Sequence, residues 1–506
     1  MPQNWENLSD PIFDHAAARP DAPAVVEGGT VLGYAELASL VGKASVYLHE
    51  HGIAAGERIG LALNNSADHI ILLFAAFRLG AVPIELSVED KPDALAATAR
   101  KYGIRTIFTE AHVPPPPGIE RIRLDMCWRD RIAAKSGDRR SAASGDELHL
   151  IALTTGTTGA AKGVVTTHRQ SIARFEVQSA LFGTYWLREP RGGTLVLTAN
   201  IRFGAFFRFL LSQLMAGGVT VVLPDCGRQP IELARAIASW DDAIAFVTAN
   251  MCRLFIEAAP SEGLLFPRAR MLVAGGMPLA AGEKQAMIAH VTPNFFDGYG
   301  TTGFGTISLL SPADMVAKAD SVGRPAAGVA VEIVDEHGRS LPAGATGRIR
   351  CRSLSSSLGQ CSEDLGPGAE FFADGWYYPG DVGFLDDAGY LHIKSRVGET
   401  FRRSGTDVFA PEVEAVLASH SAVAEAAVVA GKTLGDRDEI VAFIVKSGAL
   451  DHDELARFCR ARLTSAQIPD RVYYTEALPR IADGKLNRVR LEELAAGQTA
   501  QSSSGA

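Results

Sequence analysis

A run of threonine and glycine residues before a single lysine is the stretch of this chain with the clearest chemical character. It reads LTTGTTGAAKGVVTTH from Leu153 to His168 and follows an apolar segment, 148–153, that is typical of a buried strand. Small side chains leave backbone N–H groups free to face an anion, and Lys162 adds a movable positive charge. The residues that would hold a polyphosphate are Thr154, Thr155, Gly156, Thr157, Thr158, Gly159 and Lys162.

The spacing differs from that of a Walker loop, in which a Gly-Lys pair is followed by serine or threonine. Here Ala161 and Gly163 flank Lys162. A polar surface loop is the alternative. The order of threonine, glycine and lysine resembles the phosphate-binding loop of the adenylate-forming superfamily, which comprises acyl-CoA synthetases, the adenylation domains of peptide synthetases and firefly luciferase. The resemblance implies that a carboxylate attacks the α-phosphate of ATP, giving an acyl-adenylate and pyrophosphate, before the acyl group passes to a thiol.

The segment DGYGTTG, 297–303, follows a strand and lies where open α/β sheets bind ligands. By resemblance, Tyr299, Gly300 and Thr301 form a wall for adenine and Thr302 contacts the α-phosphate. The superfamily then has a glutamate that holds Mg²⁺, whereas this chain has Gly303. Either water and phosphate oxygens complete the metal coordination or adenylation is slow, and Gly303→Glu should maintain or raise the rate. A plain glycine-rich turn is the alternative.

Two further segments match the resemblance. WYYPGD, 376–381, places a carboxylate, Asp381, where it could accept hydrogen bonds from both ribose hydroxyls. SRVGE, 395–399, supplies Arg396 as a ribose or phosphate contact, and has Gly398 in place of the usual hinge aspartate. Glycine absorbs a large change of backbone angles with little steric cost, so domain rotation should persist.

PRIADGK, 479–485, resembles the segment that carries the catalytic lysine of the superfamily, which makes Lys485 that residue. An ammonium group can bridge the substrate carboxylate and the α-phosphate and stabilise the charge that develops on phosphorus. With Thr302 and Arg396 it completes the expected catalytic set. No general base is needed, because a carboxylate is already ionised at neutral pH.

The resemblance places the acyl pocket around residues 200–207, two glycines and the segment after Tyr299. Its expected lining is Phe203, Phe206, Phe207, Gly275, Gly276 and Phe304, which favours an aryl or medium-chain acid. Arg202 or Arg208 could instead hold a second carboxylate, and simple core packing is the alternative for the aromatic residues. Amino acids are disfavoured, because no aspartate lies between Asn200 and Phe209 to bind an α-amine.

The acceptor is expected to be coenzyme A, because Ser404 and Gly405 resemble the segment that lines a pantetheine tunnel in acyl-CoA synthetases. A separate acyl carrier protein is the second choice. A third reading is a nucleotide-binding homologue with weak catalysis, which the departures at Gly303, Ser395 and Gly398 would favour.

The composition agrees with a globular enzyme. The 506 residues are 47% hydrophobic and 21% charged and are enough for two or more domains. A net charge of −9, with no long basic run, disfavours nucleic acid as a partner. Six scattered cysteines without a C-x-x-C pair, and no apolar run long enough to span a bilayer, favour a cytoplasmic protein in a reducing compartment. A homodimer is left open.

Alternating strand and helix patterns must position these residues. A strand at 58–63, a helix at 66–78 and a strand at 81–84 predict a parallel α/β sheet, and an apolar period of two from Val329 predicts an antiparallel or barrel-like subdomain. We therefore expect a large α/β domain at 1–395, a hinge at 396–398, a small mobile α+β domain at 399–497 and a disordered tail at 498–506.

Overall fold

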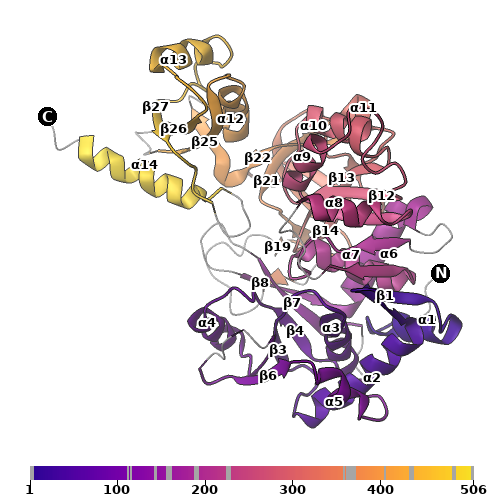
Figure 1. The fold of residues 1–506 in the computed structure, drawn as a ribbon. Helices are drawn as coiled ribbons and strands as arrows, with labels where there is room; N and C mark the ends of the chain where they lie inside the picture. Colours follow the sequence, from indigo (N-terminus) through magenta and orange to yellow (C-terminus); the bar gives the residue numbers. More distant parts are fainter. Residues whose placement is uncertain are drawn as a thin grey trace.

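The computed structural model describes residues 5–110, 113, 117–141, 145–154, 162–186, 193–223, 230–356, 359–360, 372–403, 406–431, 438–480 and 486–502 (Figure 1). The predicted fold class is confirmed: parallel sheets covered by helices are followed by an antiparallel subdomain and a small α+β part. Within the described residues, the helices include none that is both long and apolar enough to cross a membrane. Cys127, Cys252, Cys351 and Cys459 are free thiols.

The largest sheet has nine strands, and its central six are parallel. In spatial order they are β15 (Arg324–Pro325), β14 (Gly305–Leu310), β13 (Phe295–Thr301), β12 (Met271–Gly275), β11 (Ala243–Val247), β9 (Thr194–Val196), β10 (Val219–Val222), β1 (Pro23–Glu27) and β2 (Thr30–Gly33). β11 and β12 are buried along their whole length, as expected of parallel strands with covered faces.

Helices before and between these strands cover the sheet. They are α1 (Asp10–Ala18), α2 (Tyr34–Glu50), α3 (Ala67–Leu79), α6 (His168–Trp186), α7 (Gly204–Ala216), α8 (Pro230–Ala238), α9 (Ala249–Glu257), α10 (Ala281–Ala286), a π-helical turn at Met287–Val291, and α11 (Met315–Lys318). α3 is buried on all sides. It is capped at its start by the Ser66 side chain, which accepts from the His69 N–H, and at its end by left-handed Gly80.

A second parallel sheet has the order β4 (Val82–Glu85), β3 (Arg58–Ala62), β5 (Thr106–Glu110) and β6 (Glu120–Leu124), with α4 (Pro92–Tyr102) and α5 (Trp128–Ala133). The hairpin of β7 (Leu148–Thr154) and β8 (Lys162–Thr167) packs beside it, since β7 contacts β4, and β18 (Gly359–Gln360) extends the hairpin. β8 is a strand that no sequence pattern described above predicted.

The antiparallel subdomain comprises β16 (Ala330–Val334), β17 (Gly347–Arg352), β19 (Phe372–Ala373), β20 (Trp376–Tyr377), β21 (Asp381–Leu385) and β22 (Leu391–Arg396). β22 ends at the first residue of the proposed hinge, and a 3₁₀ turn, Val397–Glu399, follows.

The C-terminal part stands to one side of the other elements in Figure 1. It contains β23 (Thr400–Arg403), β24 (Thr406–Phe409), α12 (Ala410–Ala418), β25 (Val423–Ala430), β26 (Ile440–Lys446), α13 (His452–Arg460), β27 (Arg471–Thr475) and α14 (Arg488–Ser502). α14 continues five residues into the segment expected to be disordered, because alanine and glutamine favour the helix and no proline ends it. Residues 503–506 lie outside the described residues.

Two histidines are buried together near the start of α6. The rings of His149 and His168 lie 5.3 Å apart, and the Leu8 N–H donates to His168 Nδ1 at 3.2 Å. Within the described residues, His149 Nδ1 and His168 Nε2 have no hydrogen-bond partner. Burial lowers the pKa of both rings, that of His168 to about 4. Both histidines are therefore neutral structural residues.

Protonation of His168 should destabilise the fold in mild acid. Its folded pKa lies below the ordinary value of 6.5, so its contribution is complete above about pH 6.5 and is lost as the pH falls toward 4. We expect His168→Asn, which keeps an acceptor for the Leu8 N–H, to remove about 2 kcal/mol of the stability difference between pH 7 and pH 5. Urea denaturation at both pH values measures this.

His69, whose pKa is raised in contact with Glu85, contributes in the opposite sense and cancels between the two proteins. An unchanged pH dependence in His168→Asn would contradict the assignment.

Candidate functional site

The turn between β13 and β14 lies at the carboxyl end of the parallel sheet, and glycines allow its strands to approach closely. A Cβ at Gly300 would lie 2.2 Å from the carbonyl oxygen of Gly305, and one at Gly275 would lie 2.8 Å from that of Gly298. No larger residue can occupy either position without moving the backbone. Gly300 of DGYGTTG, and Gly275 in the neighbouring strand, are therefore required by strand packing as well as by any ligand.

A buried ion pair fixes the start of this motif. Lys284 Nζ, from α10, lies 2.6 Å from Asp297 Oδ2 and also donates to the Ser321 carbonyl at 2.8 Å. Both side chains are almost completely buried, so the pair is held with little competition from water. It sets the position of β13 just before Tyr299 turns toward the subdomain.

Tyr299, Asp381 and Arg396 come together from three separate motifs. The Tyr299 hydroxyl donates to Asp381 Oδ2, and Arg396 Nε lies 3.0 Å from Asp381 Oδ1. Asp381 and Arg396 are cross-strand neighbours in β21 and β22. Burial raises the pKa of Asp381, which is only 4% exposed, and Arg396 and the Tyr299 hydroxyl oppose that shift. The carboxylate thus has polar partners at both oxygens and lies beside a tyrosine ring.

Tyr377 occupies the space next to Gly303. The Thr301 hydroxyl donates to the Tyr377 hydroxyl at 2.9 Å, and the Tyr377 ring stacks against Phe304 with centroids 5.7 Å apart. A Cβ at Gly303 would lie 3.0 Å from this ring. A side chain at Gly303 would therefore press on this buried ring. For this reason we now expect Gly303→Glu to lower the rate, and the effect of the glutamate stays a prediction.

The same place offers few protein ligands for a magnesium ion among the described residues. Among the described residues, no group of three His, Cys, Asp or Glu side chains is arranged to hold a metal ion. Gly303 supplies no carboxylate, and Tyr377 leaves little room for one. The described residues do not provide the ligand that the resemblance implies, and we assign no reaction step to a magnesium ion.

The two ends of the threonine-rich segment are joined. Thr154 ends β7 and Lys162 begins β8, and the two are cross-strand partners in this antiparallel hairpin. Lys162 is half-buried. The intervening predicted residues, Thr155, Gly156, Thr157, Thr158 and Gly159, lie outside the described residues, so their phosphate-binding role stays a prediction.

Most of the predicted acyl-pocket aromatics lie near one another. Phe203 and Phe206 contact edge to face, with centroids 6.5 Å apart, and Phe206 meets Phe246 at 5.0 Å. The Phe246 ring lies 3.1 Å from the Cβ position of Gly275. Phe207 is 4% exposed and packs toward Phe77 in the same core cluster.

Gly276 and Phe304 differ from this group. Gly276 is left-handed, with φ +84°, and no described atom lies within 4 Å of its Cβ position. Phe304 has no exposed surface and packs in the core of the antiparallel subdomain against Tyr377 and Cys351. Phe304 lies in the turn before β14 and belongs to a different core cluster from Phe203, so its place in the acyl pocket stays a prediction.

Three predicted residues of the C-terminal part lie outside the described residues: Ser404, Gly405 and Lys485. The described residues on either side of them form backbone pairs with each other. Arg403 pairs with Thr406 in the β23–β24 hairpin, and Arg480 forms an antiparallel bridge with Leu486. The proposed roles of Ser404, Gly405 and Lys485 stay predictions.

Arg174 was not singled out in the sequence, yet it borders the same turn. Its side chain is 8% exposed, its Nε donates to the Ser355 carbonyl at 2.9 Å, and its Nη2 approaches the Thr302 carbonyl at 3.5 Å. Arg174 shares helical spacing with the buried residues Gln178 and Phe182 of α6. An arginine on the buried face of a helix was the signal that could have identified it.

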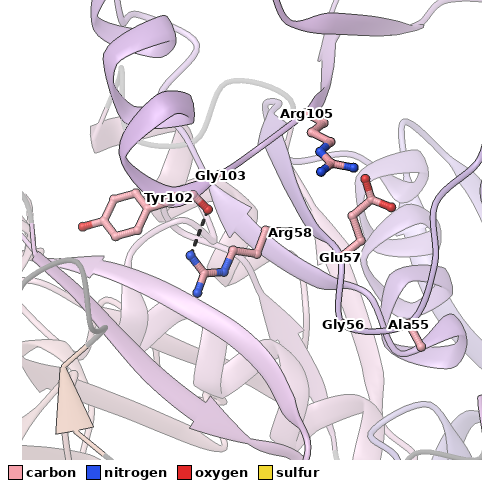
Figure 2. Close-up of a pocket in the computed structure, with 7 residues that line it drawn as sticks. All are labelled: Ala55, Gly56, Glu57, Arg58, Tyr102, Gly103 and Arg105. Atoms are coloured by element: carbon pink, nitrogen blue, oxygen red, sulfur yellow. Dashed lines mark hydrogen bonds between the residues drawn. The ribbon is translucent and has the colours of Figure 1, made fainter.

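A surface pocket of about 450 Å³ lies elsewhere (Figure 2). Figure 2 shows Arg58, at the start of β3, donating to the Tyr102 carbonyl at 3.0 Å, with Glu57 and Arg105 nearby. This is the amino-terminal edge of the smaller parallel sheet, whereas ligands of open α/β sheets bind at the carboxyl edge. The pocket does not belong to the candidate site.

Comparisons with known proteins cover both parts of the chain. Residues 12–359 match the family model described as AMP-binding enzyme, and residues 412–485 match the AMP-binding enzyme C-terminal domain. The long-chain-fatty-acid–CoA ligase of Salmonella typhimurium is 25% identical, with 98% of this chain and 96% of that protein covered. The fatty acid–[acyl-carrier-protein] ligase ScoC of Streptomyces coeruleorubidus is 26% identical, with 96% of each covered.

A solved structure shows the same fold. The o-succinylbenzoate CoA synthetase of Bacillus subtilis, in complex with its acyl-adenylate intermediate, has a TM-score of 0.85 to this chain at 21% identity, with 96% of this chain and 98% of that chain covered. The family models together extend over most of the chain and over both of its parts. The chain therefore belongs to the AMP-binding enzyme family, the adenylate-forming superfamily, and is an enzyme of the acid-thiol ligase type.

Proposed function

We propose that the chain is an ATP-dependent carboxylic acid:CoA ligase that forms an acyl-adenylate and pyrophosphate, and then an acyl-CoA thioester and AMP. The observation that carries this proposal is the convergence of Tyr299, Asp381 and Arg396 at the carboxyl edge of the parallel sheet. Tyr299 comes from a motif well before the β21–β22 hairpin that carries Asp381 and Arg396, and each of the three has a side chain suited to a nucleoside.

The nucleoside would bind against the β13 turn. Asp381 accepts hydrogen bonds from the two ribose hydroxyls, which replace the Tyr299 hydroxyl as its donor. An ionised carboxylate can do this because it has acceptor sites on both oxygens. Tyr299 with Gly300 and Thr301 then forms the adenine wall. Arg396, about half exposed at its side chain, can turn from Asp381 toward ribose or phosphate oxygens.

The phosphates would lie between the threonine-rich segment and Thr302. Backbone N–H groups and Lys162 hold the β- and γ-phosphates, and the Thr302 hydroxyl donates to the α-phosphate. Lys485 then bridges the substrate carboxylate and the α-phosphate, so that the two anions meet in line for displacement of pyrophosphate. The carboxylate oxygen forms the new bond to phosphorus, and the bond to pyrophosphate breaks.

The thioester step requires a second arrangement of the C-terminal part. The proposed hinge, 396–398, lies between β22 and β23, and the ion pair of Lys394 with Glu412, at 2.8 Å and about one third exposed, crosses this region. Partly exposed ion pairs contribute little stability and can exchange, so the domain division at 399 is compatible with rotation. The CoA thiol then attacks the acyl carbon and AMP leaves.

Coenzyme A is the proposed acceptor and an acyl carrier protein is the second candidate. The similarity to an acyl-carrier-protein ligase of similar length supports a carrier protein as the second candidate. The acid is proposed to be an aryl or medium-chain carboxylic acid, because Phe203 and Phe206 give the neighbourhood of α7 an apolar character. We further propose a cytoplasmic location.

The function is tested by exchange of labelled pyrophosphate into ATP across a panel of aliphatic and aromatic acids, followed by addition of CoA. We expect exchange that depends on the acid, and a thioester with CoA that forms faster than one with a purified acyl carrier protein. ATP binding without exchange for any acid would instead support a weakly catalytic nucleotide-binding protein.

Lys485→Ala serves as the control that assigns the first half-reaction. It should lower exchange by about a hundredfold, because it removes one charge-stabilising donor. The same variant should convert preformed acyl-adenylate and CoA to the thioester at nearly the wild-type rate. Equal loss of both steps would remove Lys485 from the adenylation step.

A side chain at Gly303 should lower activity whether or not it carries a charge. The Cβ would press on the Tyr377 ring, which Thr301 and Phe304 hold in place. We expect Gly303→Glu and Gly303→Gln each to lower kcat/KM by roughly tenfold, which corresponds to about 1.4 kcal/mol. Gly282→Gln is the control, because no described atom lies within 4 Å of that Cβ position. A Gly303→Glu enzyme as fast as wild type, with Gly303→Gln slow, would show that the carboxylate binds the metal despite Tyr377.

A further inference from the structure

Among the described residues, Arg208 is a partly buried cation that has no anion beside it. It lies in the second turn of α7, its side chain is partly buried, and its Nε has almost no exposed surface and no hydrogen-bond partner among the described residues. No carboxylate in the described part of the chain forms an ion pair with it. A buried guanidinium in this state is unfavourable, and an anion that entered the site would relieve it.

The guanidinium of Arg208 lies next to the candidate site. Side chains of a helix lean toward its amino terminus, so Arg208 covers Gly204, one turn earlier. The Cβ position of Gly204 lies 3.7 Å from Arg208 Nη1 and 3.2 Å from Thr302 Oγ1. Gly204, at the start of α7, is therefore close both to the arginine and to the threonine that is expected to contact the α-phosphate.

Further positive charge surrounds the start of α7. Arg174 approaches the Thr302 carbonyl from α6, and the amino terminus of α7, with its unpaired N–H groups, begins at Gly204. Burial lowers the pKa of Arg208 to about 10, and burial together with the charge of Arg208 lowers that of Arg174 to about 9. Both groups remain charged at neutral pH, so the local potential is positive and an anion is favoured.

Arg202 is the less suitable of the two arginines near Phe203. Its guanidinium lies over the Phe203 ring, 4.4 Å from the centroid, and its charge acts on the nearby Asp90 carboxylate. The charge of Arg202 therefore already has an anionic neighbour, whereas that of Arg208 has none among the described residues.

We propose that Arg208 binds a second carboxylate of the acid, so that the preferred substrate is a dicarboxylic acid with a short spacer between its two carboxylates. The proposal rests on the proposed function, in which the reacting carboxylate lies near Thr302. Arg208 stands on the same helix as Phe206, on the acyl side of that threonine. Its planar fork suits a carboxylate that accepts two hydrogen bonds.

The experiment compares matched acids in pyrophosphate exchange: succinate with butanoate, and phthalate with benzoate. The wild type should use at least one diacid with a kcat/KM about a hundredfold above its matched monoacid, because a monoacid leaves the arginine unpaired. Arg208→Leu should remove this advantage and leave the monoacid rate within about threefold. Arg208→Lys should restore part of it.

Arg202→Leu is the matched control and should keep the diacid preference. Monoacids that are used as well as their diacids by the wild type would overturn the proposal while leaving the ligase function intact. Loss of the preference in Arg202→Leu, but not in Arg208→Leu, would also overturn it. Absence of exchange with every acid would instead reject the function on which the proposal rests. The wild-type comparison decides the question even if Arg208→Leu fails to fold.

Discussion

The carboxylate of Asp381 is the point on which the site depends, because it joins two separately formed sheets. Tyr299 reaches it from the parallel sheet and Arg396 reaches it from the neighbouring antiparallel strand. A buried carboxylate is unfavourable unless hydrogen bonds and an opposite charge compensate for lost hydration, and these two residues supply both. The same contacts leave the carboxylate aimed at the β13 turn, so the interaction that stabilises the subdomain also prepares a place for ribose.

Positive charge exceeds negative charge around the turn between β13 and β14. The carboxylate that the superfamily has after Thr302 is replaced by Gly303 under the Tyr377 ring, and two arginines, Arg174 and Arg208, border Thr302. The surroundings of the first turns of α7 are therefore more positive than an aryl or alkyl chain requires. Phe203 and Phe206 still give them an apolar wall, which suits an acid with a short hydrophobic spacer between anionic ends.

Local patterns predicted the fold where burial was one-sided or complete. The expected strand at 58–63 and helix at 66–78 are β3 and α3, because continuous apolar runs and a serine cap leave few alternatives. Pairing across the sequence was harder to predict. β8 is a strand only because β7 pairs with it, Phe304 turns into the subdomain core, and the positions of Tyr377 and Arg174 depend on contacts between residues more than 70 positions apart. The convergence of Tyr299, Asp381 and Arg396 followed from motif resemblance. No local sequence pattern predicts that these three side chains lie together.

The central claim is that Asp381 holds the ribose of an adenylate. A crystal structure with a non-hydrolysable acyl-adenylate mimic tests it most directly. The account predicts that both ribose hydroxyls lie within hydrogen-bond distance, about 3 Å, of the Asp381 carboxylate, with the Tyr299 hydroxyl displaced and the phosphate facing Thr302. A mimic bound elsewhere, with the Tyr299 and Arg396 contacts to Asp381 unchanged, would contradict it.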